Sequence, residues 1–241
     1  MSFQIVYQSE ENDPNALHWL FHVEARSMET AGIAVGTAPS AMAKRLLYRG
    51  TIIKEGCYPD DSRYIHDEKI YFNYLYRPRW YPVIEDLTIP TFFVDDLDDT
   101  TIKQIKNRGW EKVFIKDHAK SCYDDDPQKP VWPITDLKEI KTSIREMGRK
   151  SGFSIRRYMN PSCFENERRY WVMNGKIHHS SGIIPSIVRE AATRLNRLGG
   201  LIYNIDATPE LIVEINSGES SDRKTDNTEQ DFASWISKAF N

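Results

Sequence analysis

The sequence predicts an α+β fold, in which largely antiparallel sheets are covered by helices and a smaller α/β segment comes first. Strand-like segments of the second half follow one another in pairs, and Asn174-Gly175 between two of them is a strong signal for a tight hairpin turn. Helix-like segments stand between these groups of strands. Strands that meet through hairpins, with helices between the groups, indicate antiparallel sheets with one face covered.

The composition is that of an ordinary soluble globular protein. The 241 residues are 40% hydrophobic and 28% charged, and a net charge of −3 gives no overall attraction to nucleic acid or anionic lipid. The three cysteines are widely spaced and form no CxxC pattern, which argues for a reducing compartment and against a zinc site. The start of the chain lacks a signal-peptide pattern, and no segment approaches roughly 18 apolar residues. We therefore expect a cytoplasmic protein with no membrane partner.

We place a domain boundary near residue 90, with residues 1–90 as an N-terminal domain and residues 91–241 as the larger domain. In the N-terminal domain we expect a strand at 3–7, a helix at 14–31, a short amphipathic helix at 39–50, and an aromatic strand at 69–82 that its prolines end.

The larger domain alternates more clearly between strands and helices. The acidic run "DDLDDT" (95–100) opens a helix, because Asp and Thr suit a helix N-terminus. The expected strands are 111–117, 153–159, 167–173, 176–182, 201–206 and 210–216. The other expected helices are 134–150, 185–200 and 228–240.

The segment "LIVEINSG" (211–218) ends an apolar strand with two oxygen-bearing side chains. Alternation along the strand puts Leu211, Val213 and Ile215 on one face and Ile212, Glu214 and Asn216 on the other. The paired strand ends in Asp206, so this side chain can converge with Glu214 and Asn216. Oxygen ligands with few protein contributors suit a Mg²⁺ that a nucleotide's phosphates help to hold. The alternative is a strand end that simply faces water.

Basic residues on neighbouring strands suggest an anion. Lys116 lies in the apolar strand "VFIKD", and a buried ammonium needs an anionic partner. A salt bridge or an exposed position on an edge strand would also explain this lysine. Two arginine pairs, Arg156-Arg157 and Arg168-Arg169, could each turn one guanidinium inward, where its fork suits phosphate oxygens.

Four segments then resemble a known fold, in order and in spacing: "VFIKDHAKS", "IRRYM", "ERRYWVMNGKI" and "YNIDATPELIVEINSG". They are similar to the ATP-grasp fold, and above all to the small clade named for two arginines and one lysine. The resemblance covers about residues 91–241.

The resemblance implies a role for each matching residue. The implied phosphate-binding and catalytic residues are Lys116, Arg156 and Arg169, with Glu167 beside them and Lys120 and Ser121 helping to cover the phosphates. Tyr158 and Met159 would pair with adenine, and Asp206, Glu214 and Asn216 would bind Mg²⁺.

The activity implied by the resemblance is an ATP- and Mg²⁺-dependent ligase. It would join a carboxylate to an amine through an acyl phosphate and convert ATP to ADP and phosphate. The partners would be ATP and small-molecule or peptide substrates. Residues 121–133 depart from this pattern, because they contain no Gly and carry three consecutive acidic residues. A nucleotide-binding or regulatory module without ligation is therefore a second hypothesis, and an RNA-binding or RNA-modifying protein, suggested by the arginines and the aromatic run 71–82, is a third.

Two further features receive no functional role. Adjacent strand residues such as His178 and His179 face opposite ways, which argues against a zinc site. Cys163 has no His nearby in the sequence that could activate it, which favours a free thiol. The sequence singles out no general base and does not indicate an oligomeric state.

Overall fold

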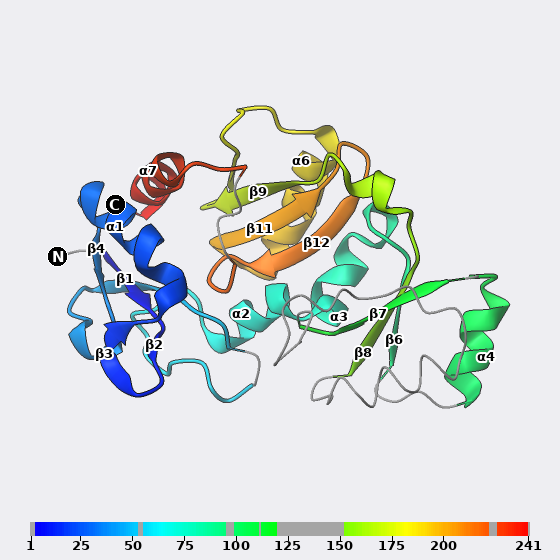
Figure 1. Cartoon of the computed structure of the whole chain (residues 1–241), viewed down its shortest axis with the longest axis horizontal. Coiled ribbons are helices and arrows are strands. Elements are labelled where there is room, and N and C mark those ends of the chain that lie inside the picture. Colours follow the sequence, from blue (N-terminus) through cyan, green and yellow to red (C-terminus); the bar gives the residue numbers. More distant parts are fainter. Residues whose placement is uncertain are drawn as a thin grey trace.

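The computed structural model describes residues 3–52, 55–94, 99–110, 112–119, 152–221 and 226–240 (Figure 1). Within these residues, the strands form a parallel N-terminal sheet, a small hairpin, and two larger antiparallel sheets. Helices α2 (Glu68–Leu75) and α3 (Arg77–Trp80) lie below the larger antiparallel sheet in Figure 1, between the N-terminal sheet and the other antiparallel sheet.

The N-terminal sheet has the parallel strand order β4-β1-β5. Its strands are β1 (Phe3–Tyr7), β4 (Ala34–Gly36) and β5 (Arg45–Arg49), and the small hairpin consists of β2 (Ser9–Glu10) and β3 (Asp13–Leu17). Helix α1 (His22–Thr30) shares a core with the C-terminal helix α7 (Glu229–Phe240). The end of the chain thus returns to the first sheet, and the α/β character expected for this segment is confirmed.

Two expected helices of this segment are wrong in part or in whole. The expected helix 14–31 begins only at His22, because the residues before it form β3 and the short 3-10 helix η1 (Trp19–Phe21). The expected helix 39–50 is instead η2 (Ala38–Ser40) followed by β5. Consecutive Leu46 and Leu47 are both fully buried because the sheet is covered on both faces, and this hides the alternation that marks a half-buried strand.

The aromatic segment 69–82, expected as a strand, is helical. It forms α2 (Glu68–Leu75), α3 (Arg77–Trp80) and η3 (Tyr81–Val83), followed by η4 (Glu85–Leu87). Asp67 caps α2 by accepting a hydrogen bond from the Ile70 N–H at 2.7 Å. Tyr71 packs into one hydrophobic cluster and Tyr74 into another. A helix that is buried on two sides carries apolar residues around most of its circumference, so its sequence lacks the one-sided helical pattern and resembles that of a buried strand.

The larger antiparallel sheet has the order β10-β9-β11-β12. Its strands are β9 (Arg168–Met173), β10 (Lys176–His178), β11 (Ile202–Ala207) and β12 (Ile212–Ser217). The predicted hairpin turn is confirmed, since Asn174 and Gly175 have positive φ angles of 48° and 76°. Helix α6 (Ser186–Leu195), followed by η6 (Asn196–Leu198), covers one face. The other face packs Trp171, Met173 and Ile202 against the N-terminal core and carries polar side chains along the rest of its strands.

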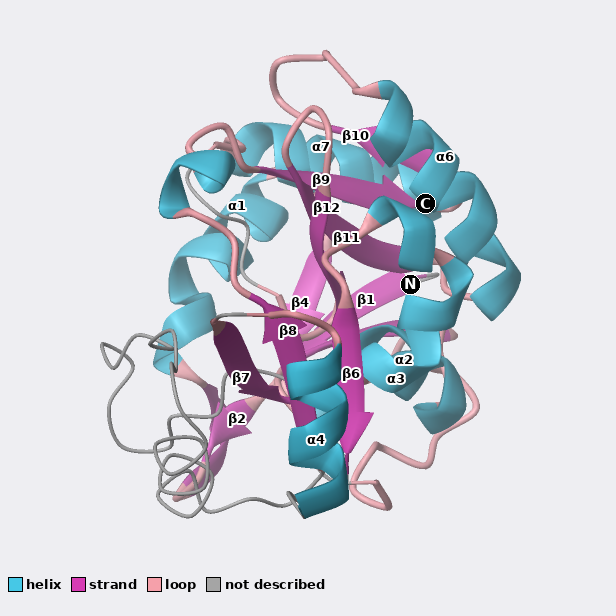
Figure 2. Ribbon diagram, turned by 90° about the vertical axis from the view of Figure 1, so that its right-hand side faces the viewer, coloured by secondary structure: helices cyan, strands magenta, loops and turns pink. Residues whose placement is uncertain are grey.

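The second antiparallel sheet has the order β6-β8-β7, with strands β6 (Thr91–Val94), β7 (Val113–Asp117) and β8 (Phe153–Arg157). Helix α4 (Asp99–Asn107) covers one face of this sheet (Figure 2). Ile105 of the helix shares a hydrophobic cluster with Ile115 and Ile155. Because side chains alternate along a strand, Lys116 and Arg156 turn to the opposite face. A short 3-10 helix, η5 (Pro161–Phe164), connects this sheet to β9.

The remaining expectations are confirmed, untested or outside the described residues. The strands expected at 3–7, 111–117, 153–159, 167–173, 176–182, 201–206 and 210–216 all appear, with boundaries shifted by a few residues, as do the helices expected after 95–100 and at 185–200 and 228–240. The helix expected at 134–150 lies outside the described residues. The boundary near residue 90 stays a prediction; Tyr74 and Trp80, which precede it, share a core with β11 and β12.

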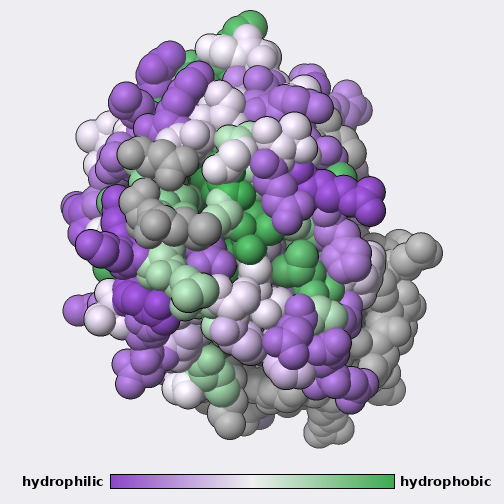
Figure 3. Space-filling model, turned by 90° about the vertical axis from the view of Figure 1, so that its left-hand side faces the viewer, coloured by the Kyte–Doolittle hydropathy of each residue, from purple (hydrophilic) through white to green (hydrophobic). Residues whose placement is uncertain are grey.

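The N-terminal side of the molecule presents a mostly hydrophilic face with an apolar area near its centre (Figure 3). A shallow hollow beside the edge strand β4 is lined in part by Ile33, Ala34, Val35 and Met42. Within the described part of the chain, no helix combines the length and apolar character that crossing a membrane requires.

Candidate active site

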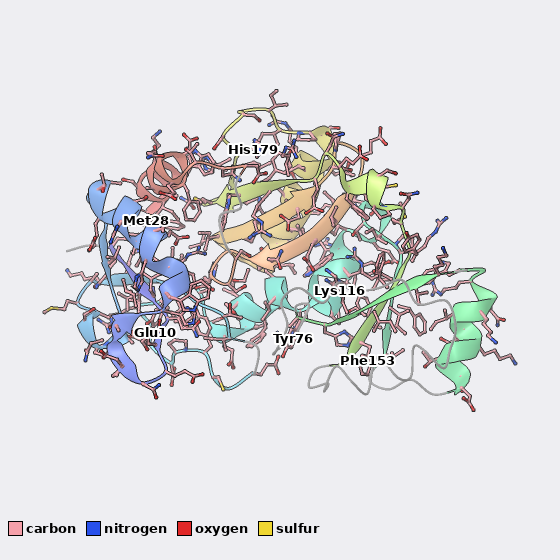
Figure 4. All side chains as sticks on the ribbon, in the orientation of Figure 1. Glu10, Met28, Tyr76, Lys116, Phe153 and His179 are labelled. Carbon is pink, nitrogen blue, oxygen red and sulfur yellow. The ribbon has the colours of Figure 1, made fainter. Side chains whose placement is uncertain are left out.

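The candidate active site lies where the polar face of the larger sheet meets the free face of the β6-β8-β7 sheet, and Glu214 of β12 is its centre. One carboxylate oxygen, Oε1, is 2.5 Å from Arg77 Nη2 and 3.5 Å from Lys116 Nζ. Figure 4 shows Lys116 between the two sheets. Among the described residues, no hydrogen bond reaches the second oxygen, Oε2. Glu214 is therefore held by one oxygen and keeps the other available to a ligand.

Arg77 is a site residue that the sequence reading missed. It is the first residue of α3, its side chain is 1% exposed, and its backbone N–H donates to the His118 carbonyl oxygen at 2.8 Å. The segment around it was interpreted as an aromatic strand, which concealed the arginine. The sequence did hold a signal, because Arg77 lies within the aromatic segment "YRPRWYP", and an arginine buried among aromatic residues needs an anionic partner.

Arg156 of β8 is the third cation near Glu214. It is 4% exposed, and its Nη2 donates to the Val213 carbonyl oxygen at 2.8 Å. Its Nε is buried and has no hydrogen-bond partner among the described residues. Burial, followed by the nearby Arg77 charge, lowers the pKa of Arg156 to about 9. A guanidinium in this position gains from an additional anion.

Cations outnumber carboxylates at this centre among the described residues, because Arg77, Lys116 and Arg156 surround Glu214 while Glu167 also acts on Arg156. Burial alone would raise the pKa of Glu214, but Lys116, Arg77 and Arg156 together hold it well below its usual range. Glu214 raises the pKa of Lys116, but burial and the two arginines outweigh it, so the pKa is lowered. Lys116 thus has the salt bridge that was one of the open alternatives. Counted over the part of the chain that the structure describes, the cluster still has more cations than carboxylates, which suits a polyanion.

Arg169 and Asp206 form a second, balanced pair on the same sheet face. They occupy facing positions of β9 and β11, and Arg169 donates from Nε to Oδ1 at 2.8 Å and from Nη2 to Oδ2 at 2.7 Å. Asp226 and Asn227 hold the Arg169 backbone, through its N–H at 2.9 Å and its carbonyl oxygen at 3.0 Å. Both oxygens of Asp206 are therefore engaged in this conformation.

Asn216, the third predicted metal ligand, faces Asn204 across the β11–β12 pair. Its Nδ2 donates to the Asn204 Oδ1 at 3.4 Å, and no hydrogen bond from the described residues reaches its own Oδ1. Asp206 and Glu214 are the next facing pair on the same face of the sheet, two residues along each strand. The convergence of Asp206, Glu214 and Asn216 on one sheet face, which alternation predicted, is what the structure shows.

A β-bulge corrects one detail of that prediction. The register shifts so that Ala207 pairs with Ile212 while Asp206 pairs with Glu214, which leaves Val213 as an extra residue. Ile212 therefore packs in the α6-covered core and does not share a face with Glu214. The carbonyl oxygen of Val213 is the one that accepts from Arg156.

The residues fit a metal ion that takes only part of its coordination from the protein. Glu214 Oε2 and Asn216 Oδ1 are hard oxygen donors, and Asp206 could join them if Arg169 released it. In the described parts of the chain, no group of three His, Cys, Asp or Glu side chains is arranged to hold a metal by itself. The set suits Mg²⁺ that is also bound by phosphate oxygens.

The remaining predicted residues lie around this centre or outside the described part. The ring of half-buried Tyr158 lies 5.1 Å from the ring of Phe114, on the face that carries Arg156, and Met159 follows it. Glu167 sits in the turn before β9, where its N–H donates to the Phe164 carbonyl oxygen at 2.9 Å. Lys120 and Ser121 lie outside the described residues.

The two features that received no role lie away from the centre. His179 Nε2 is 3.4 Å from Asp226 Oδ2, and in Figure 4 it lies beyond β9 from Lys116. Cys163 is an exposed free thiol in η5.

Comparisons with known proteins identify the fold. No protein-family model and no curated protein sequence matches the chain. Solved structures do match over the full chain. The D-cycloserine synthetase DcsG has a TM-score of 0.66 at 12% identity and covers 100% of both chains. The macrocyclase MdnC of Microcystis aeruginosa MRC, bound with its precursor peptide MdnA, has a TM-score of 0.62 at 12% identity, covering 100% of this chain and 99% of that one.

A third match is the ATP-grasp ligase PsnB complexed with minimal precursor, Mg and ADP, with a TM-score of 0.60 at 8% identity, covering 99% of this chain and 98% of that one. The chain has the ATP-grasp fold, as the sequence predicted. Identities this low establish the fold alone.

Proposed function

We propose that the protein is an ATP- and Mg²⁺-dependent ligase that joins a carboxylate to an amine. The observation that carries the proposal is the Glu214 centre, where Arg77 and Lys116 hold one carboxylate oxygen and leave the other open. Excess positive charge beside open oxygen ligands suits a nucleotide polyphosphate together with its metal ion.

Each described residue has a distinct task in this proposal. Lys116 and Arg156 neutralise the phosphates, and the buried Nε of Arg156 is a donor that a phosphate oxygen would satisfy. Arg77 keeps Oε1 of Glu214 in place, so that Oε2 and Asn216 Oδ1 bind Mg²⁺. The bound Mg²⁺ would supply charge neutralisation and align the phosphate oxygens.

The chemistry we propose is transfer of the γ-phosphoryl group of ATP to a carboxylate, which releases ADP. An amine then attacks the acyl phosphate, the C–N bond forms, and inorganic phosphate leaves. Charge neutralisation and alignment carry most of such a reaction. Arg169 would contribute to it by moving from Asp206 to the transferred phosphoryl group when the nucleotide binds.

Similar structures support both small-molecule and peptide substrates. DcsG is a D-cycloserine synthetase, whereas MdnC is a macrocyclase bound with a precursor peptide. PsnB was complexed with Mg and ADP, which supports the use of ATP and Mg²⁺ by this chain.

The RNA hypothesis has weaker support, because only Arg157 and Arg168 of the two arginine pairs are exposed. Arg156 and Arg169 are buried, with exposures of 4% and 6%, and they bind partners within the chain. Most aromatic residues of the run 71–82 are buried in the helical segment.

Two measurements test the proposal. Calorimetric titration with Mg-ADP, and with ADP in the presence of EDTA, should show binding that Mg²⁺ strengthens. Phosphate release from ATP should then increase with a carboxylate and an amine from a panel of amino acids and peptides. Absence of nucleotide binding would overturn the proposal. Binding without phosphate release under any substrate pair would favour the regulatory module, which the Gly-free segment 121–133 suggests.

A further inference from the structure

Asn204 of β11 is a fully buried amide beside the proposed metal site. It faces Asn216 on one side and Trp171 on the other, and its exposure is 0%. Its Oδ1 accepts the hydrogen bond from Asn216 Nδ2, while its own Nδ2 is buried without a hydrogen-bond partner among the described residues.

We propose that Asn204 is a positioning residue, which fixes the amide of Asn216 with its carbonyl oxygen toward the Mg²⁺ site. The inference rests on the proposed function, because it assigns Asn216 Oδ1 to the metal. It adds a residue that the sequence did not single out.

The two facing amides have two mutually exclusive arrangements. In the one seen here, Asn216 donates to Asn204, so its Oδ1 is the atom left over. In the reverse arrangement, Asn204 would donate to Asn216 Oδ1, and the NH₂ group of Asn216 would be left over instead. An NH₂ group has only hydrogen-bond donors to offer, so it cannot bind a cation. The arrangement seen here, with the Asn204 oxygen toward Asn216, is therefore the one that leaves an oxygen of Asn216 for a metal ion.

Stability alone does not account for an asparagine at this position. The buried Asn204 Nδ2 without a partner is unfavourable; an apolar side chain would remove that penalty but would leave Asn216 Nδ2 without its acceptor, so the asparagine brings little net stability. The sheet face around Asn204 already changes from apolar to charged: Ile202 lies two residues before it in a hydrophobic cluster, and Asp206 lies two residues after it. An aliphatic side chain at position 204 would be compatible with both Ile202 and Asp206. The advantage that an asparagine offers over an aliphatic residue here is therefore the orientation of a metal ligand.

The test compares Asn204→Leu and Asn204→Asp with the wild type. Leucine has a similar volume and no acceptor, while aspartate keeps the acceptor. The matched control is Tyr203→Phe, which removes a buried polar atom from the adjacent position on the opposite face, where the Tyr203 hydroxyl donates to the Asn196 Oδ1 at 2.8 Å. For each protein, calorimetry gives the Kd of Mg-ADP and of ADP in EDTA, and a melting curve gives the Tm.

We expect Asn204→Leu to change the Tm by no more than a few degrees, to weaken Mg-ADP binding about tenfold or more, and to leave metal-free ADP binding unchanged, as for other residues that orient metal ligands. Asn204→Asp should bind Mg-ADP within a few-fold of the wild type or more tightly. Tyr203→Phe should leave both Kd values unchanged.

Wild-type Mg-ADP affinity in Asn204→Leu would overturn the inference. So would a lower Tm with equal weakening of Mg-ADP and metal-free ADP, because that pattern marks a structural role. If the wild type itself binds neither form of ADP, the proposed function fails and takes this inference with it.

Discussion

Arg77 and Lys116 contact the same oxygen of Glu214, at 2.5 Å and 3.5 Å, although they come from segments 39 residues apart in the numbering (116 − 77). Arg77 belongs to α3 and Lys116 to β7. The Glu214 centre is therefore built from three segments that are distant in the sequence: α3, β7 and β12.

Replacement of Glu214 should remove metal dependence without removing affinity for anions. In Glu214→Gln the three nearby cations lose their carboxylate, so we expect the ligand-free protein to be less stable by about 3–5 kcal/mol, as when one partner of a buried charge group is removed. ADP in EDTA should still bind, whereas Mg²⁺ should no longer strengthen binding. Melting curves and calorimetry measure both effects.

Added inorganic phosphate should restore part of the lost Tm in Glu214→Gln, because it supplies the missing negative charge. A variant that melts like the wild type and retains the Mg²⁺ effect would show that Glu214 is an ordinary solvated strand end.

Replacement of Arg77 should impair the site more than replacement of its exposed neighbour. Arg77→Ala removes a hydrogen bond to a charged group, and we expect it to cost about 1–3 kcal/mol in unfolding free energy and to weaken Mg-ADP binding about tenfold. The control is Arg79→Ala on the same helix, whose side chain is 36% exposed and pairs with the exposed Glu55, so its loss should change little. Equal effects of the two substitutions would argue against a role for Arg77 in the site.

Nucleotide and Mg²⁺ should bind cooperatively, because Arg169 engages both oxygens of Asp206 in this structure. Mg²⁺ alone should therefore bind weakly. Arg169→Met should strengthen the binding of Mg²⁺ alone, since it frees a carboxylate, and should weaken the binding of ADP. Calorimetric titration with MgCl₂ and with ADP measures both.

The control for this prediction is Arg168→Met, because Arg168 is exposed and donates only to the carbonyl oxygen of Glu167 among the bonds seen here. If Arg169→Met and Arg168→Met titrate alike with Mg²⁺, Asp206 is not the ligand that Arg169 controls.

The stability of the protein should depend on Glu214 at acidic pH. Its pKa is held below the ordinary value of 4.5 by Lys116, Arg77 and Arg156, which outweigh the opposing effect of burial. A carboxyl with a lowered folded-state pKa contributes stability that is fully present above its unfolded-state pKa and is lost as the pH falls toward the folded-state value. The difference in unfolding free energy between wild type and Glu214→Gln should thus be constant near pH 7 and shrink below about pH 4.5. Denaturant unfolding at several pH values measures it, and a difference that grows on acidification would contradict the assigned charge interactions.

Much of the fold and part of the site could be predicted from the sequence, because the signals are local. The turn at Asn174-Gly175 needs residues that accept positive φ, and the alternation along 210–216 and the facing strand brought Asp206, Glu214 and Asn216 together. Lys116 was found because a charge within an apolar strand is visible in the sequence. Alternation left open which arginine of each pair faces inward, and only the resemblance to the ATP-grasp fold singled out Arg156.

Only the tertiary structure decided the rest. Helix α2 is buried on two sides, so its aromatic residues carry no one-sided helical pattern, and the same error concealed Arg77. The bulge at Val213 depends on how β12 pairs with β11, and the alignment of Asn204 with Asn216 depends on the same pairing. Local preferences specify which side chains a strand can present. Which cations share a carboxylate oxygen, and which amide orients another, depends on contacts between residues distant in the chain, where packing outweighs propensity.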